Sequence, residues 1–390
     1  MTTEFQIDRD YVLAVRRTLH EYPEIGFDLP RTTALVKREL DGLGIPYTEA
    51  YGRGSVVATL NGEKRGFTIG LRADMDALPI REAVDGPHRS RIDGAMHACG
   101  HDAHTAMLLG AAKAMHAIRD QIPCRVKLLF QPNEEGAESG AQRMVEKGVM
   151  DDIDVIIGQH VENTLEVGTI GVCKGAAMAA SRAADIHFHG KTAHATLPQT
   201  GIDALAMAVR AYTDIQFMLT REVNPFERFV CSVGTLRAGT IRNVVAEDAV
   251  MELSIRSYSP EVDALLLRRI TAICTSAAAD VGGRATVDSR ISCKVVYNDP
   301  PWSDRLLQSA AKVASRVVGD FRQKLSSEDF SHYQARKPGV FFRLGTGSPG
   351  KAAATFAHNN DFTIDEAALP IGAAVFVQFV LDHGANSPSA

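Results

Sequence analysis

The sequence has few of the features that mark secreted, membrane or nucleic-acid-binding proteins. Its six cysteines, at positions 99, 124, 173, 231, 274 and 293, lack a disulfide-framework spacing, which predicts reduced thiols and a cytoplasmic location. The start, MTTEFQIDRDYV, has no basic segment followed by an apolar one, so we expect no secretory signal, and no apolar run is long enough to predict a membrane span. The net charge is −5, from 42 basic and 47 acidic residues, so we expect no nucleic-acid partner.

The chain also lacks internal repeats and has a single tryptophan, so aromatic content gives no clue to a ligand. Its 390 residues are 45% hydrophobic and 23% charged, which is an ordinary globular composition. A chain of this length can bury two separate hydrophobic cores. We therefore expect two globular domains.

One stretch, residues 96–104 (MHACGHDAH), is dense in metal-binding residue types. It contains three histidines, one cysteine and one aspartate. Because only Gly100 separates Cys99 from His101, a turn there lets both side chains reach one ion, and a thiolate with an imidazole suits Zn, Co, Ni, Mn or Fe better than Ca or Mg. Asp102 is placed to support a ligand. The alternative is a helix start whose histidines cap or pack, with Cys99 as a small apolar residue.

Three predicted strands end close to ionisable side chains. They are 67–71, followed by Asp74 and Asp76; 126–130, followed by Glu134 and Glu135; and 155–157, followed by His160. An open α/β sheet places its ligand site beyond the carboxyl ends of its strands. Taken alone, Asp74 and Asp76 also fit a capped turn before Pro79, and His358 is weak evidence for a metal ligand. Taken together, these acidic and histidine positions favour one cation site.

The predicted order of elements divides the chain. Helices 9–21, 32–43, 105–118 and 140–149 alternate with strands 55–60, 67–71, 126–130 and 155–157. The order β-α-β-β-α-β then follows in 185–189, 202–221, 229–236, 248–258, 260–281 and 285–291, which describes a ferredoxin-like α+β insert. A helix over 303–318, a strand over 339–344 and a helix over 364–381 complete the α/β part. We therefore predict an α/β domain from 1–178 and 294–390, with an inserted domain over 179–293.

Seven motifs in order resemble the M20 metallopeptidase family, in its aminoacylase-like branch of N-acyl-amino-acid amidohydrolases, hippurate hydrolases and indole-acetyl-amino-acid hydrolases. They are HEYPEIGF (20–27), LRADMDALPI (71–80), MHACGHDAHTAMLLGAA (96–112), FQPNEEGAESGA (130–141), GQHV (158–161), SEDF (327–330) and AHNNDF (357–362). The resemblance covers nearly the whole chain.

The resemblance implies a set of site residues. The metal ligands would be Cys99, His101, Glu135, His160 and His358, holding two divalent ions per subunit, of Mn, Zn, Co or Ni. Glu134 would be the general acid/base, and Asp74 would orient a ligand, with Asp76 as a competitor. The insert would be a lid and dimerisation domain. In it, His194 would polarise the scissile carbonyl of a neighbouring subunit, and Asn243 and Arg256 would bind the oxyanion and the substrate carboxylate.

The resemblance also implies a function. It predicts hydrolysis of the amide bond of N-acyl amino acids, small-molecule substrates, by a homodimer or higher oligomer. Gln199, Ala246 and Asn360 depart from residues common in the branch, and they leave the substrate open rather than the chemistry. A dipeptidase or carboxypeptidase is the alternative with the same metal site. A protein that binds a metal or ligand without catalysis is a remote one, because no ligand is lost.

Overall fold

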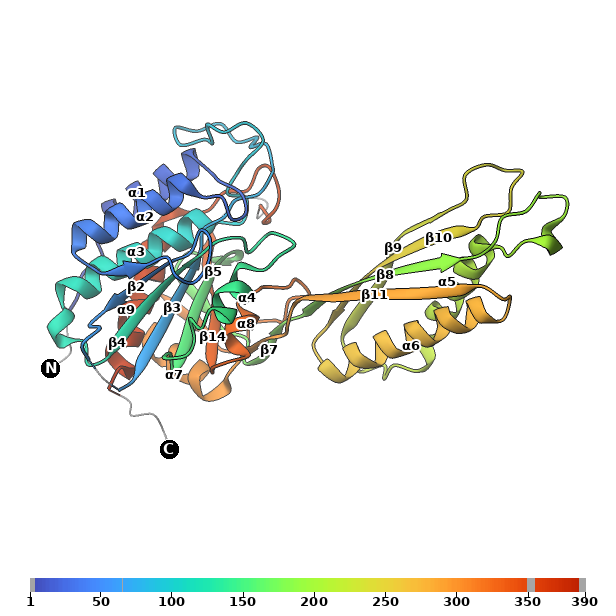
Figure 1. Cartoon of the computed structure of the whole chain (residues 1–390). Helices are drawn as coiled ribbons and strands as arrows, with labels where there is room; N and C mark the ends of the chain where they lie inside the picture. The colour runs from blue at the N-terminus through green and yellow to red at the C-terminus, as the bar shows by residue number, and fades with distance from the viewer. Residues whose placement is uncertain (1–3, 65, 349–354, 386–390) are drawn as a thin grey trace. The chain divides into compact units, whose positions relative to one another are not determined.

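The computed structural model describes residues 4–64, 66–348 and 355–385, which form two compact units (Figure 1). Unit 1 contains the described residues up to Ala177, Val296–Gln323 and those from Asp329 onward, and unit 2 contains Met178–Val295 and Lys324–Glu328. The expected insert, 179–293, falls within the first segment of unit 2. The prediction did not include the short second segment.

Unit 1 is an α/β unit built on one mixed sheet. Its helices are α1 (Arg9–Glu21), α2 (Pro30–Leu43), α3 (His101–Ala117), α4 (Gly140–Glu146), α7 (Pro300–Ala310), α8 (Ser331–Gln334) and α9 (Leu369–His383), with 3-10 turns η1 (Arg119–Gln121) and η3 (Glu366–Ala368). Its strands are β1 (Tyr47–Thr48), β2 (Val56–Leu60), β3 (Thr68–Asp74), β4 (Arg125–Gln131), β5 (Val155–Glu166), β6 (Thr169–Gly171), β13 (Arg316–Val318) and β14 (Gly339–Gly347), and β7 (Gly175–Met178) pairs with β12 (Val296–Asn298).

The sheet brings the ends of its central strands to one edge. Its order is β1-β2-β4-β3-β5-β14-β6-β13. Strand β3 runs parallel to β4 and β5, and β14 runs parallel to β5. The carboxyl ends of these four strands therefore lie side by side, where an open α/β sheet places a ligand site.

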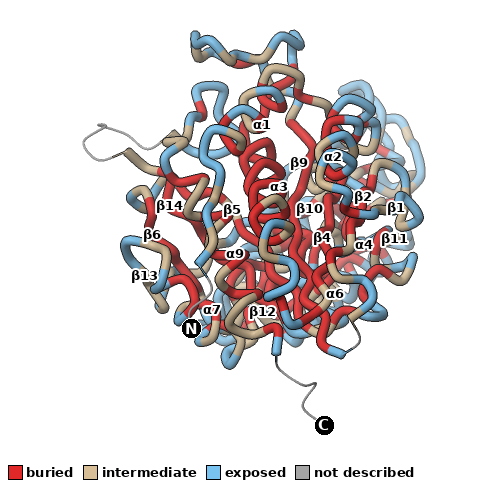
Figure 2. The backbone as a smooth tube through the Cα atoms, turned by 90° about the vertical axis from the view of Figure 1, so that its left-hand side faces the viewer, coloured by how far each residue is buried: buried red, intermediate tan, exposed pale blue. Residues whose placement is uncertain are grey.

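Helices α3 and α9 form the centre of the unit 1 core. Figure 2 shows α3 buried along most of its length, and α3 packs against both α1 and α9. Within the described part of the chain, one helical segment, Glu366–His383, is long and apolar enough to cross a membrane by length and composition. The sequence led us to expect no apolar run of this length. Half of it is buried against the rest of the chain, as in the core helix of a globular unit.

Among the elements whose bounds or type differ from those predicted, three affect the sheet or the candidate site. The helix expected over 303–318 ends at Ala310, and Arg316–Val318 pairs with β6 instead, because its valines fit a strand. Helix α3 begins at His101 rather than at 105, directly after Gly100, whose φ of 86° only glycine adopts easily. Strand β5 runs to Glu166, so His160 lies within a strand rather than past its end.

Unit 2 has the predicted β-α-β-β-α-β order. Its elements are β8 (Ala180–His189), η2 (Pro198–Thr200), α5 (Ala204–Arg221), β9 (Phe229–Ala238), β10 (Asp248–Ser257), α6 (Pro260–Ala279) and β11 (Arg284–Cys293). The antiparallel sheet has the order β11-β8-β10-β9, and both helices pack on it over a separate core. This strand order is that of a ferredoxin-like fold.

Candidate metal centre

Cys99 and His101 are positioned by the turn that starts α3. The φ of 86° at Gly100 reverses the chain between them, and both side chains are buried. A Cβ at Gly100 would lie 2.5 Å from Cγ2 of Val161 on β5, so the turn sits directly against that strand. The sequence Cys-Gly-His thus delivers a thiol and an imidazole to the edge formed by the strand ends.

Glu134 and Glu135 follow β4 and are held by their backbones. The backbone N–H groups of Glu134 and Glu135 donate to the two carboxylate oxygens of Asp76, at 2.9 and 3.0 Å. Asn133, with a φ of 52°, makes the bend just before them. One buried aspartate therefore fixes the orientation of both glutamates.

His160 and His358 complete the cluster from two distant parts of the chain. The Nε2 atom of His160 lies 3.3 Å from the sulfur of Cys99. The Nε2 atom of His358 lies 3.2 Å from Oε1 of Glu135, and Nε2 of His101 lies 3.8 Å from the same oxygen. The backbone N–H of His358 donates to the carbonyl of Ala98 at 2.8 Å, which ties its loop to the Cys99 turn.

All five predicted ligands therefore lie together, in overlapping groups. The side chains of Cys99, His101 and His160 form one group, those of Cys99, Glu135 and His358 a second, and those of His101, Glu134 and Glu135 a third. The ligand atoms within each group lie within 4.8 Å of one another. Because the groups share Cys99, Glu135 and His101, the geometry suits two adjacent ions rather than one.

The buried donors of the cluster fit a cation. Among the described residues, both ring nitrogens of His101 are buried without a hydrogen-bond partner. Buried polar atoms without a partner cost free energy, and an ion bound by them removes that cost. One thiolate, three imidazoles and a carboxylate are ligands that Zn, Mn, Co or Ni accept.

The charges of the cluster depend on one another. Burial raises the pKa of the Cys99 thiol, and the charge of Glu135 raises it further. Burial lowers the pKa of His160, and the nearby Arg343 adds to this effect. Hydrogen bonds to Cys99 and Glu135 raise the pKa of His358 to about 10. A bound cation would replace these protons and hold Cys99 as a thiolate.

Asp74 and Asp76 lie on opposite sides of the His101 ring. Oδ1 of Asp76 is 3.5 Å from Nδ1 of His101, and Oδ2 of Asp74 is 3.7 Å from Nε2. Asp74 also contacts Nδ1 of His104 at 2.6 Å and accepts from Arg72 at 2.7 Å. Nε2 of His101 faces Glu135, and the other ring nitrogen, Nδ1, faces Asp76. The carboxylate of Asp76 is therefore the one placed to orient this ligand.

A second buried polar network lies behind the cluster, and its partners were not visible in the sequence. Arg72 is fully buried and donates to Asp74, Gln131 and Asp329. Burial raises the pKa of Asp329, while Arg72 and Gln131 act against this effect. Arg72 and Asp329 both stand in quoted motifs, but their pairing spans 257 positions.

Asp102 is not a supporting partner of His101. Its carboxylate contacts Nδ1 of His20 at 2.7 Å and Arg16 at 2.9 Å, both on α1. On a helix, neighbouring residues point in different directions, so Asp102 faces away from the side that His101 occupies.

In unit 2, the structure brings His194 and Asn243 together. His194 forms an isolated β-bridge with Val244, and the N–H of Ala195 donates to the carbonyl of Asn243 at 3.0 Å. The exposed ring of His194 contacts the hydroxyl of Thr196 through Nδ1 at 2.7 Å.

Arg256 lies at the other end of the same sheet. Arg256 pairs with Ser181 at the start of β8. Asp248, which follows Asn243 by five residues, pairs with His189 at the other end of β8. The eight-residue separation along β10 corresponds to roughly 27 Å. The predicted catalytic His194 and the predicted substrate-binding Asn243 and Arg256 therefore do not form one cluster within a single unit 2.

Known proteins resemble the chain over almost its full length. Peptidase family M20/M25/M40 matches residues 70–382. The N-acetyl-L-cysteine deacetylase of Bacillus subtilis is 36% identical over 358 residues, which cover 92% of this chain and 84% of that protein. Thermostable carboxypeptidase 1 of Saccharolobus solfataricus is 34% identical over 369 residues, 93% of each protein. The crystal structure of a dinuclear metal-binding peptidase of the M20 family from Bacillus subtilis matches with a TM-score of 0.83 and 31% identity, over 96% of this chain and 97% of that one.

Proposed function

The chain belongs to peptidase family M20/M25/M40, and on this premise we propose that it is a metal-dependent amidohydrolase that cleaves the amide bond of N-acyl amino acids. The products are a carboxylic acid and a free amino acid. One observation carries the proposal: five ligand side chains from four distant stretches converge beside Glu134.

We propose two divalent ions per subunit, of Mn, Zn, Co or Ni, held by Cys99, His101, Glu135, His160 and His358. When bound, such ions lower the pKa of water and polarise a carbonyl oxygen. Asp76 orients His101, and Asp74 orients His104, which in turn accepts from the backbone N–H of Val161 at 3.0 Å. This assignment moves the orienting role at His101 from Asp74 to Asp76.

Glu134 has the position of the general acid and base. Its side chain lies in one group with His101 and Glu135, so it faces the ligands without being needed as one. In the proposed reaction it accepts the proton of the attacking water and later donates it to the leaving nitrogen. Asp76 keeps the carboxylate in place through the Glu134 backbone N–H.

His194, Asn243 and Arg256 serve the substrate in this proposal, with roles divided between subunits. An N-acyl amino acid is too short to reach both ends of a strand segment of roughly 27 Å. Arg256 therefore binds the α-carboxylate in one subunit, as a guanidinium suits. His194 and Asn243 of the neighbouring subunit stabilise the oxyanion.

A homodimer formed by unit 2 supports this division. Helix α5 carries exposed Leu205, Val209 and Tyr212 at spacings of four and three, which form one apolar face. Strand β9 is an edge of the sheet. An apolar helix face beside an open strand edge suits pairing with a second copy, and twofold pairs are the commonest assembly.

A metallo-dipeptidase or carboxypeptidase is the second candidate. The name of the Saccharolobus solfataricus relative favours it, and the cluster serves either reaction. Rates on N-acetyl amino acids, N-benzoyl amino acids and dipeptides, measured with the Mn- and Zn-loaded enzyme, separate the two. Faster cleavage of dipeptides than of every N-acyl amino acid contradicts our proposal, and no turnover of any amide leaves a non-catalytic binding protein.

We also propose a cytoplasmic location. A ligand thiol at Cys99 binds metal only while it is reduced, and the cytoplasm keeps thiols reduced. The enzyme should therefore lose activity with chelators and with thiol oxidants.

A further inference from the structure

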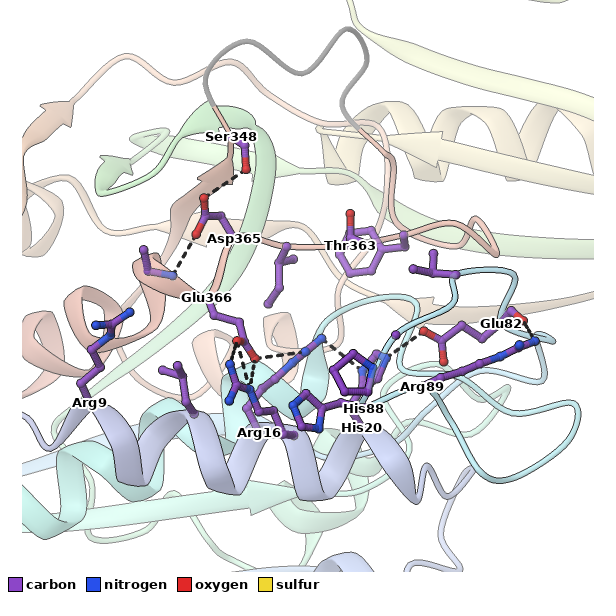
Figure 3. A pocket seen from close by; sticks show the side chains of 18 residues that line it. Arg9, Arg16, His20, Glu82, His88, Arg89, Ser348, Thr363, Asp365 and Glu366 are labelled. Carbon is purple, nitrogen blue, oxygen red and sulfur yellow. Dashed lines mark hydrogen bonds and ion pairs between the residues drawn. The ribbon is translucent and has the colours of Figure 1, made fainter.

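Unit 1 contains a cavity lined by residues outside the proposed ligand set. Its volume is about 560 Å³, which is within the range of small-molecule sites. It is bounded by α1, by the loop of residues 82–89, and by Ser348 with residues 362–367 (Figure 3). Among the described residues that line it, none belongs to the five predicted ligands.

One face of α1 supplies most of the positive charge of this cavity. Arg9, Leu13, Arg16, Arg17 and His20 follow the three- and four-residue spacing that places side chains on one side of a helix. Figure 3 shows Arg9, Arg16 and His20 rising from α1 into the cavity. With Arg89, the lining has four arginines against three acidic residues.

The arginines differ in how far their charge is already matched. Glu366 accepts from Arg17 at 2.6 Å and from Arg16 at 3.3 Å, and Arg16 also pairs with the buried Asp102. Arg89 pairs with Asp85. Within the described part of the chain, the side chain of Arg9 has no hydrogen bond or ion pair. Arg9 is an exposed residue at the start of α1, so the rim of the cavity presents a guanidinium that no described carboxylate pairs with.

The remaining lining is mixed, with His88, Ser348 and Thr363 beside apolar residues. Leu13, Val84, Phe362 and Ile364 contribute side chains to the wall. A cavity of this size with an apolar wall and an arginine fits a small molecule that has an apolar body and a carboxylate, since guanidinium pairs with carboxylate in a fork geometry.

The walls are tied to the metal cluster by short connections. The N–H of Ala83 donates to the carbonyl of Asn360 at 2.8 Å, two residues after His358. Phe362 lies 3.8 Å from the position of a Cβ at Gly100, between Cys99 and His101. A molecule held against Phe362 and residues 82–89 would therefore contact the loop that carries His358, and through Phe362 it would press on the turn that carries Cys99 and His101.

We propose that this cavity binds a small apolar carboxylate and that its occupation changes the affinity of the metal cluster. Binding is the primary claim and needs no catalysis. The identity of the ligand rests on the proposed function, in which both products, the free amino acid and the released acid, carry a carboxylate. By thermodynamic linkage, a ligand that changes metal affinity is itself bound differently when metal is present.

Calorimetric titration of the full-length, metal-loaded protein with benzoate, phenylacetate and L-phenylalanine tests the binding claim. We expect a binding event whose affinity falls about tenfold or more in Arg9→Gln, because a charge-assisted pair is lost, and falls further in Arg9→Glu. Arg38→Gln, an exposed arginine on α2 outside the cavity, should leave the event unchanged.

The three probes also identify the source of the carboxylate. Binding of benzoate and phenylacetate alone assigns the cavity to the released acid, binding of L-phenylalanine alone assigns it to the amino acid, and equal binding means that the carboxylate and the apolar body suffice. The rate at which a chelating dye removes metal should change with the bound probe in the wild type and not in Arg9→Gln. The proposal is overturned if the wild type and Arg9→Gln give identical isotherms, or if Arg38→Gln loses as much affinity as Arg9→Gln. It is also overturned by no binding at about 10 mM probe, or by a chelation rate that the bound probe does not alter. If probe binding depends on Arg9 but the protein turns over no amide, the proposed function is contradicted and the binding claim stands.

Discussion

At the scale of single residues, Glu134 and Glu135 are neighbours in sequence and differ in surroundings. Glu135 is in contact with His358 and His101, while Glu134 is grouped with His101 and Glu135. A base that is not itself a required ligand is expected to be replaceable without loss of metal.

Glu134→Gln should keep metal content and lower kcat by about 10²–10⁴-fold, because the amide neither accepts nor returns a proton. Elemental analysis and steady-state kinetics on one purified sample measure both quantities. Glu138→Gln is the matched control, since this exposed glutamate in the same loop pairs with Arg143. A Glu134→Gln enzyme with near wild-type kcat at full metal occupancy contradicts the assignment.

Cys99→Ala should lower metal content after dialysis, with activity falling in proportion. The sulfur of Cys99 belongs to two of the overlapping groups, so its loss weakens both sites. Cys173→Ala, which removes a thiol outside the cluster, should retain metal. Normal metal content in Cys99→Ala rules out the thiol as a ligand.

At the scale of elements, the sequence predicts regular, strongly patterned segments best. Helix α1 has the predicted bounds, because Asp8 caps its start and Pro23 follows its end. The sequence predicts that the helix starting at 303 continues to 318, but it ends at Ala310. Pairing with β6, more than 140 residues away, decided the structure of residues 316–318, and no local pattern shows such a partner.

The turn before α3 offers a test of how tightly the cluster is built. Gly100→Ala forces a residue with a Cβ into the left-handed region and presses that Cβ on Val161, which lies 2.5 Å away. Gly94 also has a positive φ, of 77°, but no atom within 4 Å of its Cβ position. We expect Gly94→Ala to cost about 1–2 kcal/mol, from the backbone alone. Gly100→Ala should cost about 1–3 kcal/mol more.

Urea unfolding of both variants measures the difference between the backbone cost and the crowding. In a Val161→Ala background the additional cost of Gly100→Ala should shrink, since the crowding atom is gone. Equal destabilisation by Gly94→Ala and Gly100→Ala would mean that the turn does not press on β5.

The last turn of α9 is held to α7 by a charge whose effect depends on pH. Asp382 accepts from Ser309 and from Lys312, each at 2.6 Å. Burial raises the pKa of Asp382, but the hydrogen bonds from Lys312 and Ser309 outweigh it and lower the pKa below the ordinary 3.8. A carboxyl whose folded pKa is depressed contributes stability above its unfolded pKa and loses it as the pH falls through the folded one.

Asp382→Asn should therefore cost about 1–2 kcal/mol at pH 7, and the difference from the wild type should shrink progressively as the pH falls below about 4. Urea unfolding at pH 7, 5, 4 and 3 follows the difference. Asp120→Asn, at a position that is almost fully exposed, should match the wild type throughout. A cost for Asp382→Asn that stays constant down to pH 3 contradicts an ionised Asp382 as its cause.

At the scale of the whole molecule, the family, the α/β fold with a ferredoxin-like strand order, and a hydrolase with a metal cluster all agree with the sequence prediction. Matches over residues 70–382 and over almost the full length of known relatives confirm the family. The choice between Asp74 and Asp76, the network around Arg72 and the separation of Arg256 from His194 depend on three-dimensional neighbours. Residue types and spacing contain no information on these points.

The separation of Arg256 from His194 leads to a test of assembly. His194→Ala should fold, keep metal and lose about 10²–10³-fold in kcat through one missing oxyanion donor. Mixing it with Glu134→Gln should restore part of the activity, because one mixed pair contains one complete composite site. Native mass spectrometry counts the mixed pairs, and mixed pairs without restored activity would rule out shared sites.

The three-segment construction of unit 1 has a consequence for synthesis on the ribosome. Four of the five proposed ligands have been translated by residue 160, but His358 and the central strand β14, which pairs with β5, follow nearly 200 residues later. At 5–20 residues per second this interval lasts roughly 10–40 s. Unit 2, whose main segment is translated within it, can fold first. The sheet therefore lacks β14, and the proposed centre lacks His358, until residue 358 has been translated, so we expect no amide hydrolysis by the nascent chain before that point.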